Sequence, residues 1–273
     1  MAQSAFMTVL EHLGELRRRI IRSAIVFLLA TMFCFYYGYE PVKLVLVAPL
    51  EALNANTKNP FSAYNPLVRR LRPQMVGPTT VVQVRLNAMT PWEPFMVKFN
   101  ISMLGALVIS SPFLFYQLWA FIGAGLRPGE KSVVLRYLPL SLALFIAGML
   151  FAYLVALPIA MLYLLTVDPE INLVLMYAPY MKLIIKIMAA FGLVFQLPLV
   201  MMALARLGLV QVKTMTHYRR HAIVGLFITA ALLAPSPDPF SMCLLAIPMI
   251  ALYEFGILLS KLAEKRMAAA HPA

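Results

Sequence analysis

The feature that most constrains this chain is the length of its uncharged segments. Residues 99–129 contain a single charged residue, Arg127, and several further stretches are nearly as apolar. An α-helix needs about 20 apolar residues to cross the hydrocarbon core of a bilayer, which is about 30 Å thick. The strands of a membrane β-barrel alternate apolar and polar residues, and these runs do not. The sequence therefore predicts an all-α integral membrane protein.

Six transmembrane helices are expected, at residues 20–37, 95–122, 136–164, 179–205, 222–235 and 240–260. Hydrophobic residues make up 62% of the chain and charged residues 12%, outside the range of soluble domains. The fifth and sixth spans are short, with about 13 to 15 apolar residues each, or roughly 20 Å of helix. A hydrophobic length this short favours a locally thinned bilayer.

The distribution of basic residues predicts the orientation of the chain. Lys and Arg cluster before the first span, between the second and third, between the fourth and fifth, and after the sixth. The positive-inside rule places these segments in the cytoplasm. Residues 1–273 are then one six-helix membrane domain with both termini cytoplasmic. We expect a cytoplasmic amphipathic helix at 1–19, a long extracytoplasmic loop at 38–94 and a cytoplasmic tail at 261–273.

Two polar residues within the predicted spans are candidates for function, because such residues are costly in a bilayer. Glu254 is either a bundle-facing carboxylate satisfied by Tyr253, Arg219 or Arg220, or a direct ligand or proton carrier. Gln196 either makes an interhelical hydrogen bond or docks a partner. A small-solute or proton-coupled transporter using Glu254 and Gln196 is therefore one possible function.

The motifs of common enzymes are absent from the sequence. There is no Gly-x-Ser-x-Gly elbow, no His-Glu-x-x-His and no phosphate-binding Gly-rich loop. The two cysteines lie in apolar segments, where a thiol usually behaves as a small hydrophobe. We therefore expect neither an enzyme nor a disulfide, metal, cofactor or nucleic-acid partner.

A series of short motifs resembles the TatC family, the multi-spanning receptor subunit of the twin-arginine protein translocase. In chain order they are His12-Leu-Gly-Glu-Leu-Arg17, Thr90-Pro-Trp-Glu-Pro-Phe95, Ser111-Pro-Phe-Leu-Phe-Tyr-Gln-Leu-Trp-Ala-Phe121, Gly125-Leu-Arg-Pro-Gly-Glu130-Lys131, Phe151-Ala-Tyr153, Phe191-Gly-Leu-Val-Phe-Gln-Leu-Pro198, Tyr218-Arg-Arg220, Pro235-Ser-Pro-Asp-Pro-Phe-Ser241 and Leu252-Tyr-Glu254. Their order and spacing together are specific, and they extend over nearly the whole chain.

The resemblance implies a concave, glove-like bundle in a bacterial or archaeal-type plasma (inner) membrane. It implies a non-enzymatic receptor that binds the Arg-Arg signal peptides of folded cargo on the cytoplasmic face, drawing on the proton-motive force. Single-span TatA and TatB subunits are the implied partners, and self-association is expected. The implied signal-peptide residues are Glu15, Glu130, Phe121, Arg17, Arg19 and Leu126. The implied partner-docking residues are Gln196, Pro198, Ala234, Pro235 and Asp238.

The two carboxylates also have plain structural interpretations. Glu15 precedes Arg19 by four residues, an orientation that stabilises a helix by about 0.2 to 0.5 kcal/mol. Glu130 lies near the start of the third span, where a negative charge complements the helix dipole. Phe121 fits an aromatic belt at the membrane interface as well as a peptide site. A receptor for two arginines nevertheless needs two acceptors, because each guanidinium presents a rigid fork to a carboxylate.

Overall fold

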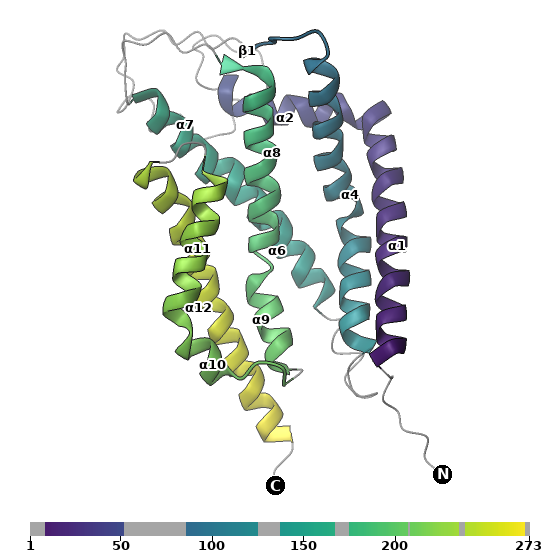
Figure 1. The fold of residues 1–273 in the computed structure, drawn as a ribbon, viewed down its shortest axis with the longest axis vertical. Helices are drawn as coiled ribbons and strands as arrows, with labels where there is room; N and C mark the ends of the chain where they lie inside the picture. The colour runs from purple at the N-terminus through teal and green to yellow at the C-terminus, as the bar shows by residue number, and fades with distance from the viewer. Residues whose placement is uncertain are drawn as a thin grey trace.

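The computed structural model describes residues 9–51, 86–124, 137–166, 175–206, 208–234 and 238–270. Nearly all of these residues are helical (Figure 1). The exceptions include two short parallel strands, β1 (Leu86–Asn87) and β2 (Leu175–Met176). The prediction of an all-α membrane protein is confirmed.

The first span belongs to a long helical segment that bends. Helix α1 (Val9–Phe33) continues through a π-helical turn, η1 (Cys34–Gly38), into α2 (Tyr39–Glu51). Figure 1 shows α2 turning away from α1 and lying across the end of the bundle. The predicted amphipathic segment is therefore continuous with the first span from Val9, and the predicted loop at 38–94 begins with a helix. The rest of that loop up to residue 85 lies outside the described residues.

The second to fourth predicted spans form the middle of the bundle. They are α4 (Glu93–Ala124), the segment α6 (Leu138–Phe151), η3 (Ala152–Ala156) and α7 (Leu157–Thr166), and the pair α8 (Tyr177–Val194) and α9 (Leu197–Arg206). Helix α4 packs along α1, and α8 packs against both α4 and α6. Helix α8 therefore occupies the centre of the fold.

The last part of the chain forms α10 (Val212–His217), α11 (Arg219–Leu233) and α12 (Pro239–Ala270). Helix α12 packs against α9 and α11. Helix α11 has only 15 residues, as predicted for a short fifth span. Helix α12 has 32 residues and is longer than predicted, because the helix continues through residues 261–270, which are rich in the good helix formers Lys, Glu and Ala.

Five helical stretches in the described part of the chain are long and apolar enough to cross a membrane: Gly14–Ala48, Glu93–Gly123, Leu138–Met161, Tyr177–Arg206 and Pro239–Glu264. Each contains or overlaps one predicted span, and α11 occupies the remaining one. Helix α1 begins and α12 ends at the same end of the bundle (Figure 1). We call this the terminal end, and the end near α2 the opposite end.

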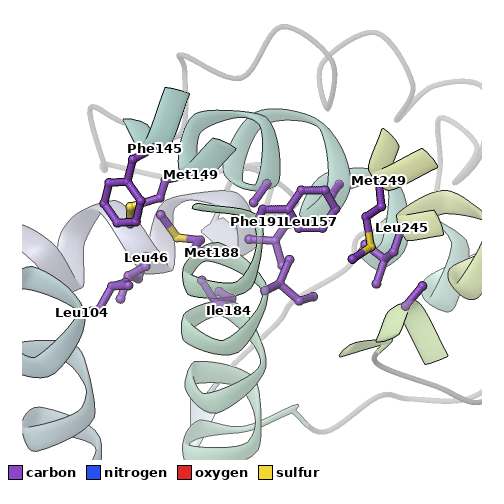
Figure 2. Close-up of a cluster of buried hydrophobic side chains, with 14 of the residues drawn as sticks. Leu46, Leu104, Phe145, Met149, Leu157, Ile184, Met188, Phe191, Leu245 and Met249 are labelled. Carbon is purple, nitrogen blue, oxygen red and sulfur yellow. The ribbon is translucent and has the colours of Figure 1, made fainter. Parts of the chain in front are cut away.

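The core lies where α8 meets its neighbours. Buried side chains recur along α8 at helical spacing, including Ile184, Ile187 and Phe191. Figure 2 shows Phe145 and Leu245 in the same region, on α6 and α12 respectively. The α1 segment lies at the edge of the bundle, and few of its side chains are buried, which leaves most of its surface to lipid or a partner.

Candidate functional site

A cluster of polar side chains joins α1 to α4 near the terminal end. Arg19 donates hydrogen bonds to Glu15 Oε1 from Nε, at 3.0 Å, and from Nη2. Its Nη1 donates to Gln117 Oε1 at 3.2 Å. The side chains of Glu15 and Arg19 are each 21% exposed, so water screens the pair only partly. The helical Glu–Arg pair expected from the sequence is therefore present, and Gln117 extends it to a second helix.

The second oxygen of Glu15 is different from the first. Oε2 is buried and accepts no hydrogen bond from the residues that the structure describes. A carboxylate has two oxygens that can each accept hydrogen bonds, and an unmet buried acceptor is unfavourable. Glu15 is thus a carboxylate with one oxygen paired with Arg19 and the other buried without a donor among the described residues.

An apolar hollow of about 410 Å³ lies directly beside this cluster, between α1 and α4. Its lining residues are Leu16, Arg19, Ile20, Ser23, Ala24, Phe27, Leu114, Gln117, Leu118 and Phe121. Most of this surface is aliphatic or aromatic, with Arg19 and Gln117 as the charged and amide groups. The hollow thus suits an apolar segment that follows a cationic one.

The structure brings together three of the residues singled out from the sequence. Glu15, Arg19 and Phe121 belong to this cluster or to its hollow, whereas Arg17 is exposed on α1. Leu126 and Glu130 lie outside the described residues, as does Pro235. The expected pairing of Glu15 with Glu130 is therefore still a prediction.

Gln117 is the residue that the sequence analysis did not single out, although it lies within a quoted motif. It precedes Phe121 by four residues, so the two side chains share one face of α4. In the sequence, this spacing and the position of Gln117 as a polar residue in an otherwise apolar run are the signals that could have identified it. Its role depends on contact with α1, which the sequence alone does not give.

A second polar network ties α4, α6 and the α8–α9 junction together. Gln196 Nε2 donates to the Ser141 carbonyl at 2.8 Å, and Trp119 Nε1 donates to Ser141 Oγ. Gln196 is only 7% exposed. Of the two alternatives for Gln196, the interhelical hydrogen bond is present, and partner docking is still a prediction. Pro198, next to it on α9, is also buried.

The other residues expected to dock a partner lie near the connection between α11 and α12. Ala234 directly follows α11 and is partly exposed. Asp238 precedes α12, and its Oδ2 accepts a hydrogen bond from Ser241 N at 2.7 Å. A carboxylate in this position caps the start of the helix. Asp238 therefore has a structural role at the connection.

Glu254 forms an ion pair with Arg219, with 2.8 Å between Oε1 and Nε, and both side chains are more than one third exposed. Arg219 is one of the three partners predicted for it, while the Tyr253 hydroxyl donates instead to the Met215 carbonyl. In the described residues no group of three or more His, Cys, Asp or Glu is placed to hold a metal ion. Because Glu254 and Gln196 both have partners within the chain, this arrangement does not favour the transporter alternative.

Comparison with known proteins agrees with the fold and the motifs. The family described as Sec-independent protein translocase protein (TatC) matches residues 11–248. The chain is 31% identical over 263 residues to the TatC protein of Aquifex aeolicus, covering 95% of this chain and 97% of that protein. It is 30% identical over 262 residues to TatCy of Bacillus subtilis, covering 95% and 91%.

Two crystal structures of a twin-arginine translocase receptor TatC resemble the whole fold. One has a TM-score of 0.70 at 29% identity and covers 93% of this chain and 99% of that structure. The other, in the detergent DDM, has a TM-score of 0.74 at 30% identity and covers 91% and 99%. The sequence, the fold and these similarities together show that the chain is a multi-pass membrane protein of the TatC family, a component of the Sec-independent protein translocase.

Proposed function

We propose that the chain is the receptor of a twin-arginine translocase and binds Arg-Arg signal peptides of folded cargo at its terminal end. The observation that carries the proposal is Glu15 Oε2, which is buried and accepts no hydrogen bond from the described residues, on a carboxylate paired with Arg19, a lining residue of the apolar hollow. A signal arginine donates to Oε2, and the apolar part of the peptide follows into the hollow. Glu130 receives the second arginine.

The chemistry distinguishes arginine from lysine. A guanidinium offers several donors in one plane, so it reaches Oε2 while Arg19 retains Oε1. An ammonium has the same charge but lacks the fork. A hydrogen bond to a charged group contributes about 1.5 to 3 kcal/mol, which exceeds the 0 to 1 kcal/mol of an exposed ion pair. Arg19 orients Glu15, Phe121 contacts the peptide, and Arg17 and Leu126 flank the site.

Photo-crosslinking of a signal peptide to the full chain tests this proposal. The peptide carries Arg-Arg or Lys-Lys, and the chain is unmodified or carries Glu15→Gln or Glu130→Gln. We expect capture of the Arg-Arg peptide to fall about tenfold with Lys-Lys or with either variant, because each change removes about 1.4 kcal/mol. Glu40→Gln, at an exposed position near the opposite end, is the control. Equal capture in every arm overturns the proposal.

The proposed receptor faces the cytoplasm. Its terminal end carries the basic residues of α1, including Arg17, Arg18 and Arg22, and the positive-inside rule favours the cytoplasm for them. Both termini of the chain are then cytoplasmic in a plasma (inner) membrane. Two kinds of reporter are fused to each terminus in cells, one active only in the cytoplasm and one active only outside it. We expect only the cytoplasmic reporter to be active at either terminus. Activity of an extracytoplasmic reporter at either terminus contradicts the orientation.

We also propose that single-span TatA and TatB subunits dock along α9, α11 and α12. In this proposal the chains self-associate within the assembly, and the assembly uses the proton-motive force for export. Ala234, Pro235 and Asp238 form the contact at the α11–α12 connection, while Gln196 and Pro198 support α9 from within. Replacing Ala234 with Leu is expected to reduce copurification of tagged TatA or TatB. Ala143→Leu, at an exposed position on α6, is the matched control. Equal copurification with both variants argues against docking there.

A further inference from the structure

Helix α8 carries two lysines on one exposed face within a membrane-spanning stretch. Lys182 and Lys186 are separated by four residues, so their side chains lie one above the other on the helix. Both are exposed, although the stretch Tyr177–Arg206 is long and apolar enough to span a membrane. A charged side chain facing hydrocarbon is costly. The surroundings of these lysines must therefore supply polar partners.

The part of the chain that the structure describes supplies few such partners. Lys186 Nζ donates to the carbonyl of Leu232, in the last turn of α11, where helix carbonyls lack partners within the helix. Among the described residues Lys182 has no hydrogen-bond or ion-pair partner. Its charge acts on Glu93 electrostatically, but both oxygens of that buried carboxylate already accept backbone N–H groups. Because an ammonium has three N–H donors, at least two remain available on each lysine.

The depth of Lys186 indicates what lies next to it. Lys186 precedes Arg206 by 20 residues of α8 and α9, which are interrupted only by a turn at residues 195–196. Twenty residues of helix rise about 30 Å, the thickness of the hydrocarbon core. Arg206 lies over the ring of Tyr137, 5.2 Å from its centroid, and Tyr side chains are typical of a membrane interface. When Arg206 is at one interface, Lys186 is at the level of the lipid headgroups of the other leaflet.

Helix α11 ends near Lys186. Its last residue is Leu233, and the Leu232 carbonyl accepts the hydrogen bond from Lys186, so α11 itself does not continue alongside Lys182. Both lysine side chains are exposed, so lipid headgroups can approach them. The geometry points to a phosphate-binding site, formed by Lys182 and Lys186 beside the end of α11, for an anionic glycerophospholipid such as phosphatidylglycerol. The site is separate from the signal-peptide site and does not depend on the proposed function.

Lipid retention by the purified full chain tests the site. The protein is held in micelles doped with phosphatidylglycerol or phosphatidylcholine of matched acyl chains, and bound lipid is counted by native mass spectrometry. We expect preferential retention of phosphatidylglycerol. Each Lys→Gln change is expected to weaken this retention about fivefold, equivalent to about 1 kcal/mol for a basic side chain at an anionic membrane surface.

Two further variants separate binding from folding and from net charge. Lys182→Arg/Lys186→Arg keeps both charges and is expected to retain the lipid. Lys213→Gln/Lys261→Gln removes the same charge from exposed positions toward the terminal end and is expected to leave the retention at Lys182 and Lys186 unchanged. If Lys182→Gln/Lys186→Gln does not fold, Lys182→Gln alone decides the test, since in the described residues Lys182, unlike Lys186, has no hydrogen bond to α11. Unchanged retention, an equal loss in both double Gln variants, or equal binding of the two lipids overturns the proposal.

Discussion

Gly148 on α6 lies so close to Phe191 on α8 that a Cβ atom at Gly148 would be 2.6 Å from the Phe191 carbonyl oxygen. The contact is reciprocal, because a Cβ at Gly192 on α8 would be 2.7 Å from the ring of Phe145 on α6. Small residues allow membrane helices to approach closely, and van der Waals packing drives their association. The two glycines therefore fix the distance between α6 and the central helix.

Gly148→Ala is expected to lower the free energy of unfolding by about 1 to 3 kcal/mol, the usual cost of overpacking. The backbone oxygen of Phe191 cannot rotate away, so the helices must separate. Gly225→Ala is the control, because a Cβ there meets nothing within 4 Å. It is expected to leave stability unchanged or raise it by about 0.5 to 1 kcal/mol through helix propensity. Thermal unfolding in detergent measures both, and equal effects would contradict the close contact.

Glu93 links the starts of two helices. Its Oε2 accepts from Met89 N at 2.7 Å and Thr90 N at 3.4 Å, and its Oε1 accepts from Ala178 N, near the start of α8, at 2.7 Å. Glu93→Gln replaces one of these acceptors with an NH2 donor and leaves a backbone N–H unpaired. We expect a lower Tm than for Glu40→Gln, where the carboxylate is exposed. Matching Tm values would show that Glu93 does not hold α4 and α8 together.

The sequence predicts helices well here because apolar runs are long, and the observed α4 bounds differ from the predicted span by two residues at each end. It predicts loops less well. Residues 39–51 contain Pro41 and Pro49, and they fall within the predicted loop. They form α2, which continues from η1 and buries Leu46 and Ala48 against the rest of the bundle.

The candidate site can be predicted in part, because only some of its contacts lie within one helix. The Glu15–Arg19 pair follows from spacing along one helix, which the sequence records directly. The contribution of Gln117 depends on how α4 packs against α1, and the lysines of α8 stand out only once the end of α11 is placed beside them. Contacts between helices that are far apart in the sequence are not encoded in local periodicity.

Glu15→Gln distinguishes a structural role of the carboxylate from a functional one. The pair with Arg19 connects adjacent turns of the same helix, so its loss is expected to reduce stability by less than about 1 kcal/mol. Capture of an Arg-Arg signal peptide is expected to fall about tenfold in the same variant. Unfolding and crosslinking measured on one preparation test both effects. A large loss of stability with unchanged capture would identify Glu15 as structural only.

The ion pair between Arg219 and Glu254 is expected to contribute little. Its side chains are 44% and 40% exposed, so water screens their attraction. A double-mutant cycle with Arg219→Gln and Glu254→Gln is expected to give a coupling energy of about 0.2 to 1 kcal/mol in unfolding experiments. Protein export is expected to continue in both single variants. Abolished export in Glu254→Gln with normal folding would instead indicate a direct role of that carboxylate.

The length of α11 provides a test of membrane thinning. Its 15 residues give about 22 Å of helix, which is less than the hydrocarbon thickness of about 30 Å. Four leucines inserted after Leu233 add about 6 Å and carry the helix past the level of Lys186. If a short hydrophobic length thins the bilayer and thinning assists transport, export of a twin-arginine cargo is expected to decrease. A Gly-Ser-Gly-Ser insertion at the same position lengthens the connection without extending the apolar helix, and it is expected to export more than the leucine variant. Normal export with the leucine insertion would show that thinning beside α11 has no role.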